Sequence, residues 1–286
     1  MMRNKESGQA LVLVLLSLSV VLTLILYILS RSITDVAVSS RQEEAVRAFS
    51  AAEAGIERAL VTGADYTGIE IGNAQYTTTT TDFASGSYEF PFLSPISSGD
   101  TVTVWFVSHD ENGNLICDAT HPCFTGDTIE ICWGNYQADP NSPNTPAIEA
   151  SVYYYEPDEP TLIKVGRAAI DPYAGRRDTN SFDPPQEVSC DIGGQPYAFH
   201  KTINFNIDLN VNPAGLQFAQ LKMFYNSDTP HIIGVRVTGD TLPSQGKQID
   251  SSGVAGDSNR RVVVYQGWPE FTFASNALIS PFGIIQ

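Results

Sequence analysis

An uncharged apolar run near the N terminus constrains this chain more than any other feature. Residues 10–30 read ALVLVLLSLSVVLTLILYILS, and a helix of that length spans about 30 Å, which matches the apolar thickness of a bilayer. Arg3 and Lys5 precede the run, which favours a cytoplasmic N terminus and an exported remainder. The run is longer than the apolar part of an ordinary signal peptide, so we expect the anchor to be retained.

Helical spacing continues beyond the apolar run. Apolar side chains recur at three- and four-residue steps with charged residues mostly between them, which predicts an amphipathic helix. These residues are Ile33, Val36, Ala45, Val46, Phe49, Ala52, Ile56 and Leu60. No proline interrupts residues 9–62, and Gly63 suits a helix C-cap. We expect one helix over residues 9–62, about 80 Å long, half in lipid and half against a soluble head.

The remainder, residues 63–286, predicts a β-rich head, so the expected fold class is α+β. Apolar residues at 203, 205, 207 and 209 alternate with Asn and Asp, as in a strand with one solvated face. Further strands are expected over residues 101–107, 148–155, 161–169, 232–237, 261–265 and 270–273. The five threonines at 77–81 predict an edge strand. The proline-rich segment 138–146 predicts a loop, where the head could divide into two subdomains.

The charge of the chain bears on which partners it can bind, and its cysteines bear on whether it forms disulfides. The chain has 16 Lys plus Arg against 32 Asp plus Glu, a net charge of −16, so the head as a whole is not expected to bind nucleic acid. Its four cysteines follow the apolar run and form no CxxC pair, which favours disulfides over free thiols. Three pairings are possible; we favour Cys117 with Cys123 and Cys132 with Cys190, one tight loop and one long loop.

Few patterns indicate chemistry in the head. Oxygen-bearing residues fall at the spacing of Ca²⁺ ligands in one segment, namely Asp110, Asn112, Asn114 and Asp118. Because Asn112-Gly113 is also a standard hairpin turn, a plain hairpin is our preferred interpretation and no cofactor is otherwise expected. The four histidines are dispersed, and nucleophile-elbow, phosphate-loop and dinucleotide motifs are absent from the sequence. We therefore expect no catalytic residues and no enzyme.

Some aromatic and basic residues could instead bind a partner. Trp105, Trp133, Trp268 and Tyr153–Tyr155 could form an adhesive surface, although most should lie in the core. The pairs Arg176-Arg177 and Arg260-Arg261 could contact an acidic partner.

Short segments of the helix carry a family resemblance. Gly8 ends a basic leader, Gly8–Val12 reads GQALV, and Ala48–Gly55 reads AFSAAEAG. They resemble the prepilin cleavage site, the Gly-x-Ala-Leu-Val opening and the Phe-x-Ala-Ala-Glu-Ala-Gly segment of type IV pilins. The resemblance is strongest to minor pilins with a PilX-type start and to the related tip pseudopilin of type II secretion. It covers about a fifth of the chain well, with a weaker likeness over residues 242–264.

The resemblance implies a structural filament subunit with a long pilin helix packed on a β-rich head. Prepilin peptidase would remove residues 1–8, leaving Gln9 as a methylated N terminus. The matched helix-packing residues are Phe49, Ala51, Ala52, Glu53 and Gly55. The implied partners are other pilins and minor pilins, prepilin peptidase, the pilus assembly platform and the membrane. The implied location is the inner or cytoplasmic membrane, single-pass with the N terminus cytoplasmic, followed by a cell-surface filament.

One departure from the family pattern bears on position in the filament. Major pilins carry Glu five residues after the cleaved Gly, whereas this chain has Leu13. That carboxylate pairs with the N-terminal ammonium of the subunit ahead, which offsets its desolvation. A subunit without it fits assembly initiation or the filament tip, and insertion along the shaft remains an alternative. Rival interpretations are a signal-anchored adhesin outside any filament and a membrane-tethered hydrolase with a nucleophile near His109 or His200.

Overall fold

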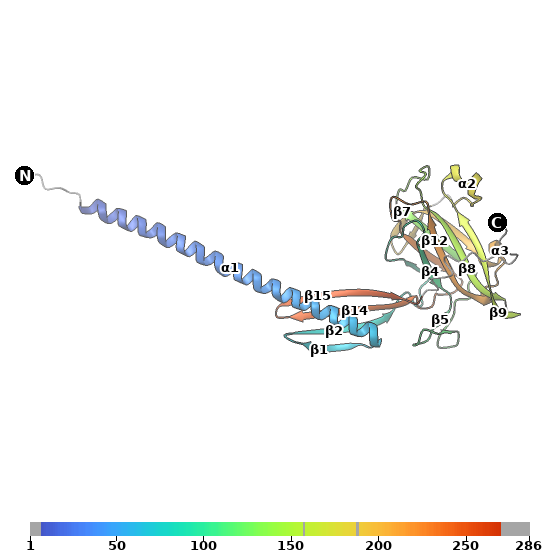
Figure 1. The fold of residues 1–286 in the computed structure, drawn as a ribbon, viewed down its shortest axis with the longest axis horizontal. Helices are drawn as coiled ribbons and strands as arrows, with labels where there is room; N and C mark the ends of the chain where they lie inside the picture. Colours follow the sequence, from blue (N-terminus) through green and yellow to red (C-terminus); the bar gives the residue numbers. More distant parts are fainter. Residues whose placement is uncertain (1–6, 157, 187–188, 270–286) are drawn as a thin grey trace, which may run out of the picture. The chain divides into compact units, whose positions relative to one another are not determined.

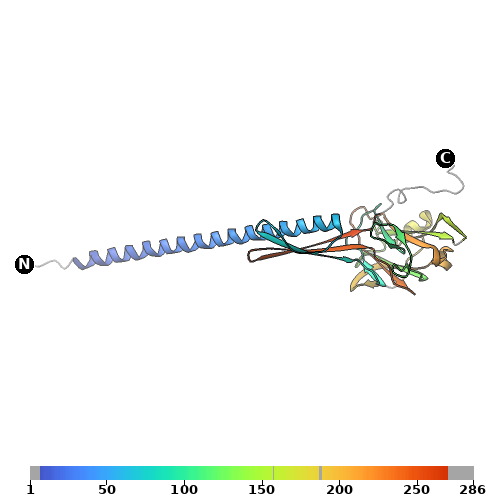
Figure 2. The same cartoon turned by 90° about the horizontal axis from the view of Figure 1, so that it is seen from below.

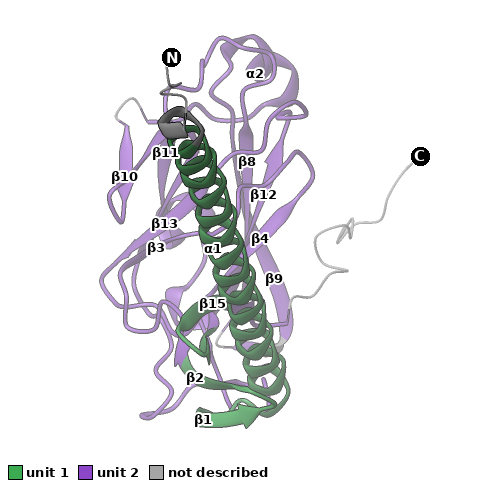
Figure 3. Ribbon diagram, turned by 90° about the vertical axis from the view of Figure 1, so that its left-hand side faces the viewer, with its two compact units in different colours: residues 1–80, 248–264 green, residues 81–247, 265–286 purple. Residues whose placement is uncertain are grey.

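The computed structural model describes residues 7–156, 158–186 and 189–269 of an α+β protein. The chain divides into two compact units, coloured separately in Figure 3. Unit 1 comprises Met1–Thr80 and Gln248–Val264, and unit 2 comprises Thr81–Lys247 and Tyr265–Gln286. The segment 138–146 is a loop, as expected, and it lies inside unit 2.

Unit 1 combines a long helix with an antiparallel hairpin and two strands from late in the sequence. Helix α1 (Ser7–Thr62) ends where predicted, because Gly63 has φ 67° and donates its N–H to the Ala59 carbonyl at 2.7 Å. The sheet has the order β1-β2-β14-β15, with β1 (Tyr66–Ile71), β2 (Ala74–Asp82), β14 (Gly246–Ala255) and β15 (Ser258–Gly267). Figures 1 and 2 show the C-terminal half of α1 lying along this sheet.

Two expectations for unit 1 were wrong. The threonine run lies in β2, which is an interior strand between β1 and β14 and not an edge strand. Val46, Phe49 and Leu60 do not face the sheet, since they are 60%, 45% and 38% exposed. The buried side of α1 instead follows residues three and four positions apart, most of them small because the sheet approaches closely: Ala48, Ala51, Ala52, Gly55, Ile56 and Ala59.

Unit 2 contains two antiparallel sheets. The five-stranded sheet has the order β10-β11-β7-β13-β3, with β10 (Cys190–Ile192), β11 (Gln195–Asn204), β7 (Thr128–Asn135), β13 (Ile233–Thr238) and β3 (Glu89–Pro91). The four-stranded sheet has the order β4-β12-β8-β9, with β4 (Thr101–Trp105), β12 (Leu216–Phe224), β8 (Ala147–Glu156) and β9 (Glu159–Ile170). Figure 1 shows these four strands side by side.

The two sheets share one apolar core. Ile129, Ile131 and Trp133 of β7 belong to the same buried cluster as Ile148 and Val152 of β8. Alternate residues of each strand point inward, as in a β-sandwich. A small hairpin of β5 (Ser108–His109) and β6 (Leu115–Ile116), two short helices and a 3₁₀ turn complete the unit: α2 (Ala174–Asn180), α3 (Phe205–Leu209) and η1 (Pro213–Gly215).

Most predicted head strands are present, with one correction. The strand expected to continue through residue 209 stops at Asn204, and residues 205–209 form α3. Asn204 is the N-cap, since its side chain accepts hydrogen bonds from the amides of Asn206 and Ile207. Asn210 closes the helix in the left-handed conformation. Local capping therefore overrides the alternating pattern. The strand predicted over 270–273 lies outside the described residues.

Candidate functional site

The N-terminal half of α1 is an unpartnered apolar surface. Its large apolar side chains from Leu11 to Leu29 are between 48% and 68% exposed. Within the described residues, Leu11–Thr62 is a helix long and apolar enough, by length and composition, to cross a membrane. The expected cleavage residues Gly8 and Gln9 lie in the first turn of α1; their side chains and residues 1–6 of the leader lie outside the described part.

The C-terminal half of α1 contacts the sheet of unit 1 through backbone. A Cβ atom on Gly253 of β14 would lie 1.9 Å from the Ala48 carbonyl oxygen and 2.6 Å from the Ala52 amide nitrogen. A Cβ atom on Gly55 would lie 2.4 Å from Ser251 Oγ. Gly253 admits no side chain because the helix backbone lies at its Cβ position, whereas Gly55 packs against side chains of the sheet. Both glycines let the helix approach the sheet closely.

The five predicted helix-packing residues lie on two sides of α1. Ala51, Ala52 and Gly55 are covered by the chain's own sheet, whereas Phe49 and Glu53 are exposed. The small residues are therefore not available to a neighbouring helix, which differs from our expectation. The physical reason is that small residues permit close approach by any backbone, and here a strand uses them. The side of α1 that carries Phe49 remains open to a partner.

The disulfides in unit 2 have the pairing favoured from loop lengths. Cys117 pairs with Cys123, and Cys132 of β7 pairs with Cys190 of β10. Their Cα–Cα distances of 5.5 and 6.0 Å lie within the usual range. Tyr197 packs with the second pair, and burial raises its pKa to about 12.

The spacing considered for Ca²⁺ forms a turn that satisfies its own carboxylates. Asp110 Oδ1 accepts hydrogen bonds from the amides of Asn112 and Asn114, and Oδ2 accepts one from Asn114 Nδ2, all between 2.8 and 2.9 Å. Asp118 Oδ1 accepts from the hydroxyl and amide of Thr120 and from the amide of His121. These bonds lower the pKa of both carboxyl groups, chiefly through the Asn114 and Thr120 side chains. The β5–β6 hairpin thus accounts for the spacing.

The basic pairs are largely engaged inside each unit. Arg176 bonds the fully buried carboxylate of Asp171 through Nε and Nη2, and it also donates to the carbonyls of Pro143 and Thr145. It therefore fixes the 138–146 loop and is not available to an acidic partner. Arg261 pairs with Asp250 of the neighbouring strand, which lowers the pKa of that carboxyl group.

Most of the candidate adhesive aromatics lie in the core. Trp133, Trp105 and Tyr153 are 0%, 3% and 4% exposed, whereas Trp268 is half-buried. Trp268 stacks on His109 at 4.5 Å between ring centroids, and Trp105 meets the same imidazole edge-on at 4.6 Å. Burial lowers the pKa of His109 to about 4, so this ring is neutral near neutral pH.

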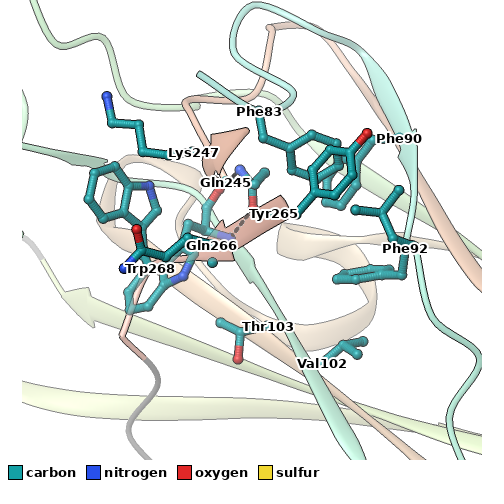
Figure 4. Close-up of a pocket in the computed structure, with 13 residues that line it drawn as sticks. Phe83, Phe90, Phe92, Val102, Thr103, Gln245, Lys247, Tyr265, Gln266 and Trp268 are labelled. Atoms are coloured by element: carbon teal, nitrogen blue, oxygen red, sulfur yellow. Dashed lines mark hydrogen bonds between the residues drawn. The ribbon is translucent and has the colours of Figure 1, made fainter. Parts of the chain in front are cut away.

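Trp268 lines two neighbouring pockets of unit 2. The first, here the aromatic pocket, has a volume of about 180 Å³. Figure 4 shows Phe83, Phe90 and Tyr265 grouped at one side, with Trp268 at the other. The Phe83 ring centroid lies 5.6 Å from that of Phe90 and 5.2 Å from that of Tyr265. The sequence prediction missed this pocket, although the two-residue spacing of Phe90 and Phe92 was a usable signal.

The second, here the acidic pocket, has a volume of about 270 Å³. It carries the carboxylates of Asp82, Asp110 and Glu111, and one ammonium, Lys247, which pairs with Asp82 at 2.6 Å. Lys247 and Trp268 line both pockets, so the two pockets are adjacent. Within the described residues, no cluster here offers three closely placed metal ligands.

Comparison with known proteins adds no assignment. No family model, no curated protein and no solved structure matches this chain.

Proposed function

We propose that this chain is a structural subunit of a type IV pilus or related filament, a minor pilin or pseudopilin. The observation that carries the proposal is the design of α1. Its first half exposes apolar side chains without interruption, and its second half joins its own sheet through the AFSAAEAG segment. A helix built this way can leave lipid for a bundle of like helices while unit 1 stays folded.

The exposed apolar half needs one of two environments. In the membrane it is covered by lipid, and in a filament it is covered by neighbouring helices. Lipid tails are as apolar as Leu, so the exchange changes little hydrophobic free energy. Extraction from the membrane therefore requires an external ATPase of the assembly platform, and the chain itself catalyses nothing.

The open side of α1 supplies the proposed contact with other subunits. Phe49 is 45% exposed and Val46 is 60% exposed. Their burial against another helix would stabilise assembly by up to about 1–3 kcal/mol per side chain. We expect Phe49→Ala to reduce incorporation into filaments without changing the fold, with Ile207→Ala, at an 81% exposed site of unit 2, as the control.

The absence of a carboxylate at Leu13 supports a position at the tip or in assembly initiation. A subunit with Glu there needs an ammonium from the subunit ahead to offset the desolvation of its charge, whereas Leu13 carries no such requirement. Insertion along the shaft is the alternative position, and adhesion through unit 2 is compatible with either.

The test is the mature N terminus. The full chain is coexpressed with prepilin peptidase and compared with Gly8→Ala by mass spectrometry. We expect cleavage after Gly8 and methylation of Gln9 in the parent chain, and no cleavage in the variant. An intact Met-initiated N terminus in both would overturn the proposal and favour a signal-anchored adhesin that never enters a filament.

A further inference from the structure

Strand β4 has an open edge beside the aromatic pocket. Among the described residues it stands at the end of its sheet and pairs with β12 alone. The Phe106 amide donates to the Gln217 carbonyl at 2.9 Å, in register with this pairing. In an antiparallel pair, successive residues direct their N–H and C=O groups alternately toward the partner strand and away from it. The N–H and C=O of Trp105 and Thr103 therefore point away from β12.

At Trp105, the side-chain amide of Gln245 bonds the outward N–H and C=O groups. Gln245 Oε1 accepts the Trp105 N–H at 2.8 Å, and Gln245 Nε2 donates to the Trp105 carbonyl at 2.9 Å. This is the exchange that a residue of an added strand would make. The Gln245 amide shows that the edge accepts such a partner and marks where pairing stops.

Thr103 lacks the equivalent partner. No strand of the described chain lies on its outward side. Its hydroxyl is also buried without a hydrogen bond, and the residue is only 8% exposed while lining the aromatic pocket. A buried hydroxyl without a hydrogen bond is unfavourable. The outward N–H and C=O of Thr103 are placed to bond a ligand that both donates and accepts along a line.

The pockets beside this edge specify side chains for that ligand. The aromatic pocket, at about 180 Å³, has room for one large apolar side chain against Phe92 and Tyr265. The adjacent acidic pocket has three carboxylates against one ammonium. Because Lys247 is already paired with Asp82, the charge of Asp110 and Glu111 favours a basic side chain.

We propose that the β4 edge binds an extended peptide segment of another protein by strand addition. The segment would pair its backbone with Thr103, place an aromatic or large aliphatic side chain in the aromatic pocket, and direct a Lys or Arg toward the acidic pocket. A lipid tail could fill the aromatic pocket but would leave the Thr103 N–H and C=O unbonded. The proposal does not rest on the filament role of α1.

The experiment uses the full chain in detergent and a phage-displayed library of random dodecapeptides. We expect selected peptides to share one aromatic or large aliphatic residue and one basic residue. A synthetic consensus peptide is then titrated by fluorescence anisotropy beside three analogues: the apolar anchor changed to Ser, the basic residue changed to Glu, and single backbone amides N-methylated in turn. Each side-chain change, and methylation at alternate amides, should weaken binding about tenfold or more.

Protein variants provide matched controls. Glu111→Lys should weaken binding of the parent peptide about tenfold, whereas Glu70→Lys, an exposed charge reversal on β1 of unit 1, should leave it unchanged. Thr103→Pro removes the outward N–H on an edge strand that can tolerate proline, and it should abolish binding. The N-methylated peptides test the same bond even if this variant does not fold.

Three outcomes would overturn the proposal. Selection that enriches no peptide means the edge has no such ligand. Binding that ignores N-methylation means that the pocket, and not the strand edge, holds the ligand. A chain ending at Pro269 that binds the peptide more than about tenfold tighter than the full chain means that residues 270–286 are the native occupant. None of these results depends on cleavage at Gly8.

Discussion

The two units of this chain differ in how each is packed internally. In unit 1, the backbones of α1 and β14 touch at Gly253, and Gly55 of α1 packs directly against the Ser251 side chain, so neither position has room for an added carbon atom. In unit 2, the interior is filled by large side chains, with Trp133, Phe106 and Tyr197 among those fully buried. Unit 1 should therefore be most sensitive to small-to-large changes and unit 2 to large-to-small changes.

The largest expected effect is Trp133→Ala in unit 2. The Trp133 side chain is completely buried, and its Nε1 donates to the Pro146 carbonyl at 2.9 Å. Truncation leaves a cavity and one buried carbonyl without its donor, so the free energy of unfolding of unit 2 should fall by about 3–5 kcal/mol. Denaturant unfolding followed by near-UV circular dichroism measures this loss.

The matched control for that change is Trp268→Ala, at a half-buried site of the same unit. It should cost clearly less, and amides of 248–264 in unit 1 should keep their hydrogen-exchange protection in both variants. Equal losses in the two variants, or loss of protection in unit 1, would show that the contrast between the units is mistaken.

The next largest effect is a difference in how the stability of the two units depends on pH, because all four histidines lie in unit 2. Burial lowers the pKa of His109 to about 4, and burial also lowers the pKa of His231. At His109 the unfolded chain therefore binds more protons than the folded chain between about pH 4 and about pH 6.5, and His231 acts in the same direction. Stability from His109 is complete above pH 6.5, falls as pH drops toward 4 by at most about 3 kcal/mol, and changes no further below.

Thermal melts of the full chain at pH 7, 5.5 and 4.5 test this pH dependence. His109→Phe keeps a ring between Trp105 and Trp268 but cannot be protonated, so it should flatten the pH dependence of unit 2. His121→Gln, at a half-buried site of the same unit, should not flatten it. A pH dependence that survives in His109→Phe would assign the loss to other groups.

A smaller effect is expected in unit 1 from one methyl group. Gly253→Ala places Cβ against the Ala48 carbonyl oxygen and the Ala52 amide, and the helix must move away. We expect a loss of about 1–3 kcal/mol in the free energy of unfolding of unit 1. Hydrogen exchange over residues 48–59 should report it. Gly267→Ala is the control, because its Cβ would meet nothing within 4 Å and its φ is not positive.

How much the sequence predicts also differs between the units. Helix α1 and its end at Gly63 follow from local signals, namely an apolar run, periodicity and a C-cap. The sheet that packs against α1 cannot be predicted from local signals, because β2 precedes most of unit 2 in the sequence and β14 follows it. Which face of α1 is buried depends on that distant strand, so Phe49 and Val46 were placed on the wrong side.

In unit 2 the sequence pattern located some strands and missed others, independently of their position in the sheet. The hairpin strands β8 and β9 were predicted nearly in full, although β8 is an interior strand and most of it is buried. The strands β7 and β12 were not predicted, and most of each is likewise buried, which weakens the alternation that marks a half-exposed strand. The aromatic pocket was missed because segments 83–105 and 245–268 meet only in the folded unit.

The smallest expected effect is at Asn204, where strand β11 ends and helix α3 begins. Asn204 caps α3 by accepting the amides of Asn206 and Ile207, and its own amide donates to Asp208 Oδ2 at 2.7 Å. Asn204→Ala should cost about 1 kcal/mol, because two amides of the first turn lose their acceptor. If capping decides this segment, hydrogen exchange at 206–209 should rise while β11 keeps its protection. If the alternating pattern determines the structure of this segment, β11 should lengthen in the same variant and hydrogen-exchange protection should increase through Leu209. That result would mean that the Asn204 cap does not cause α3 to form.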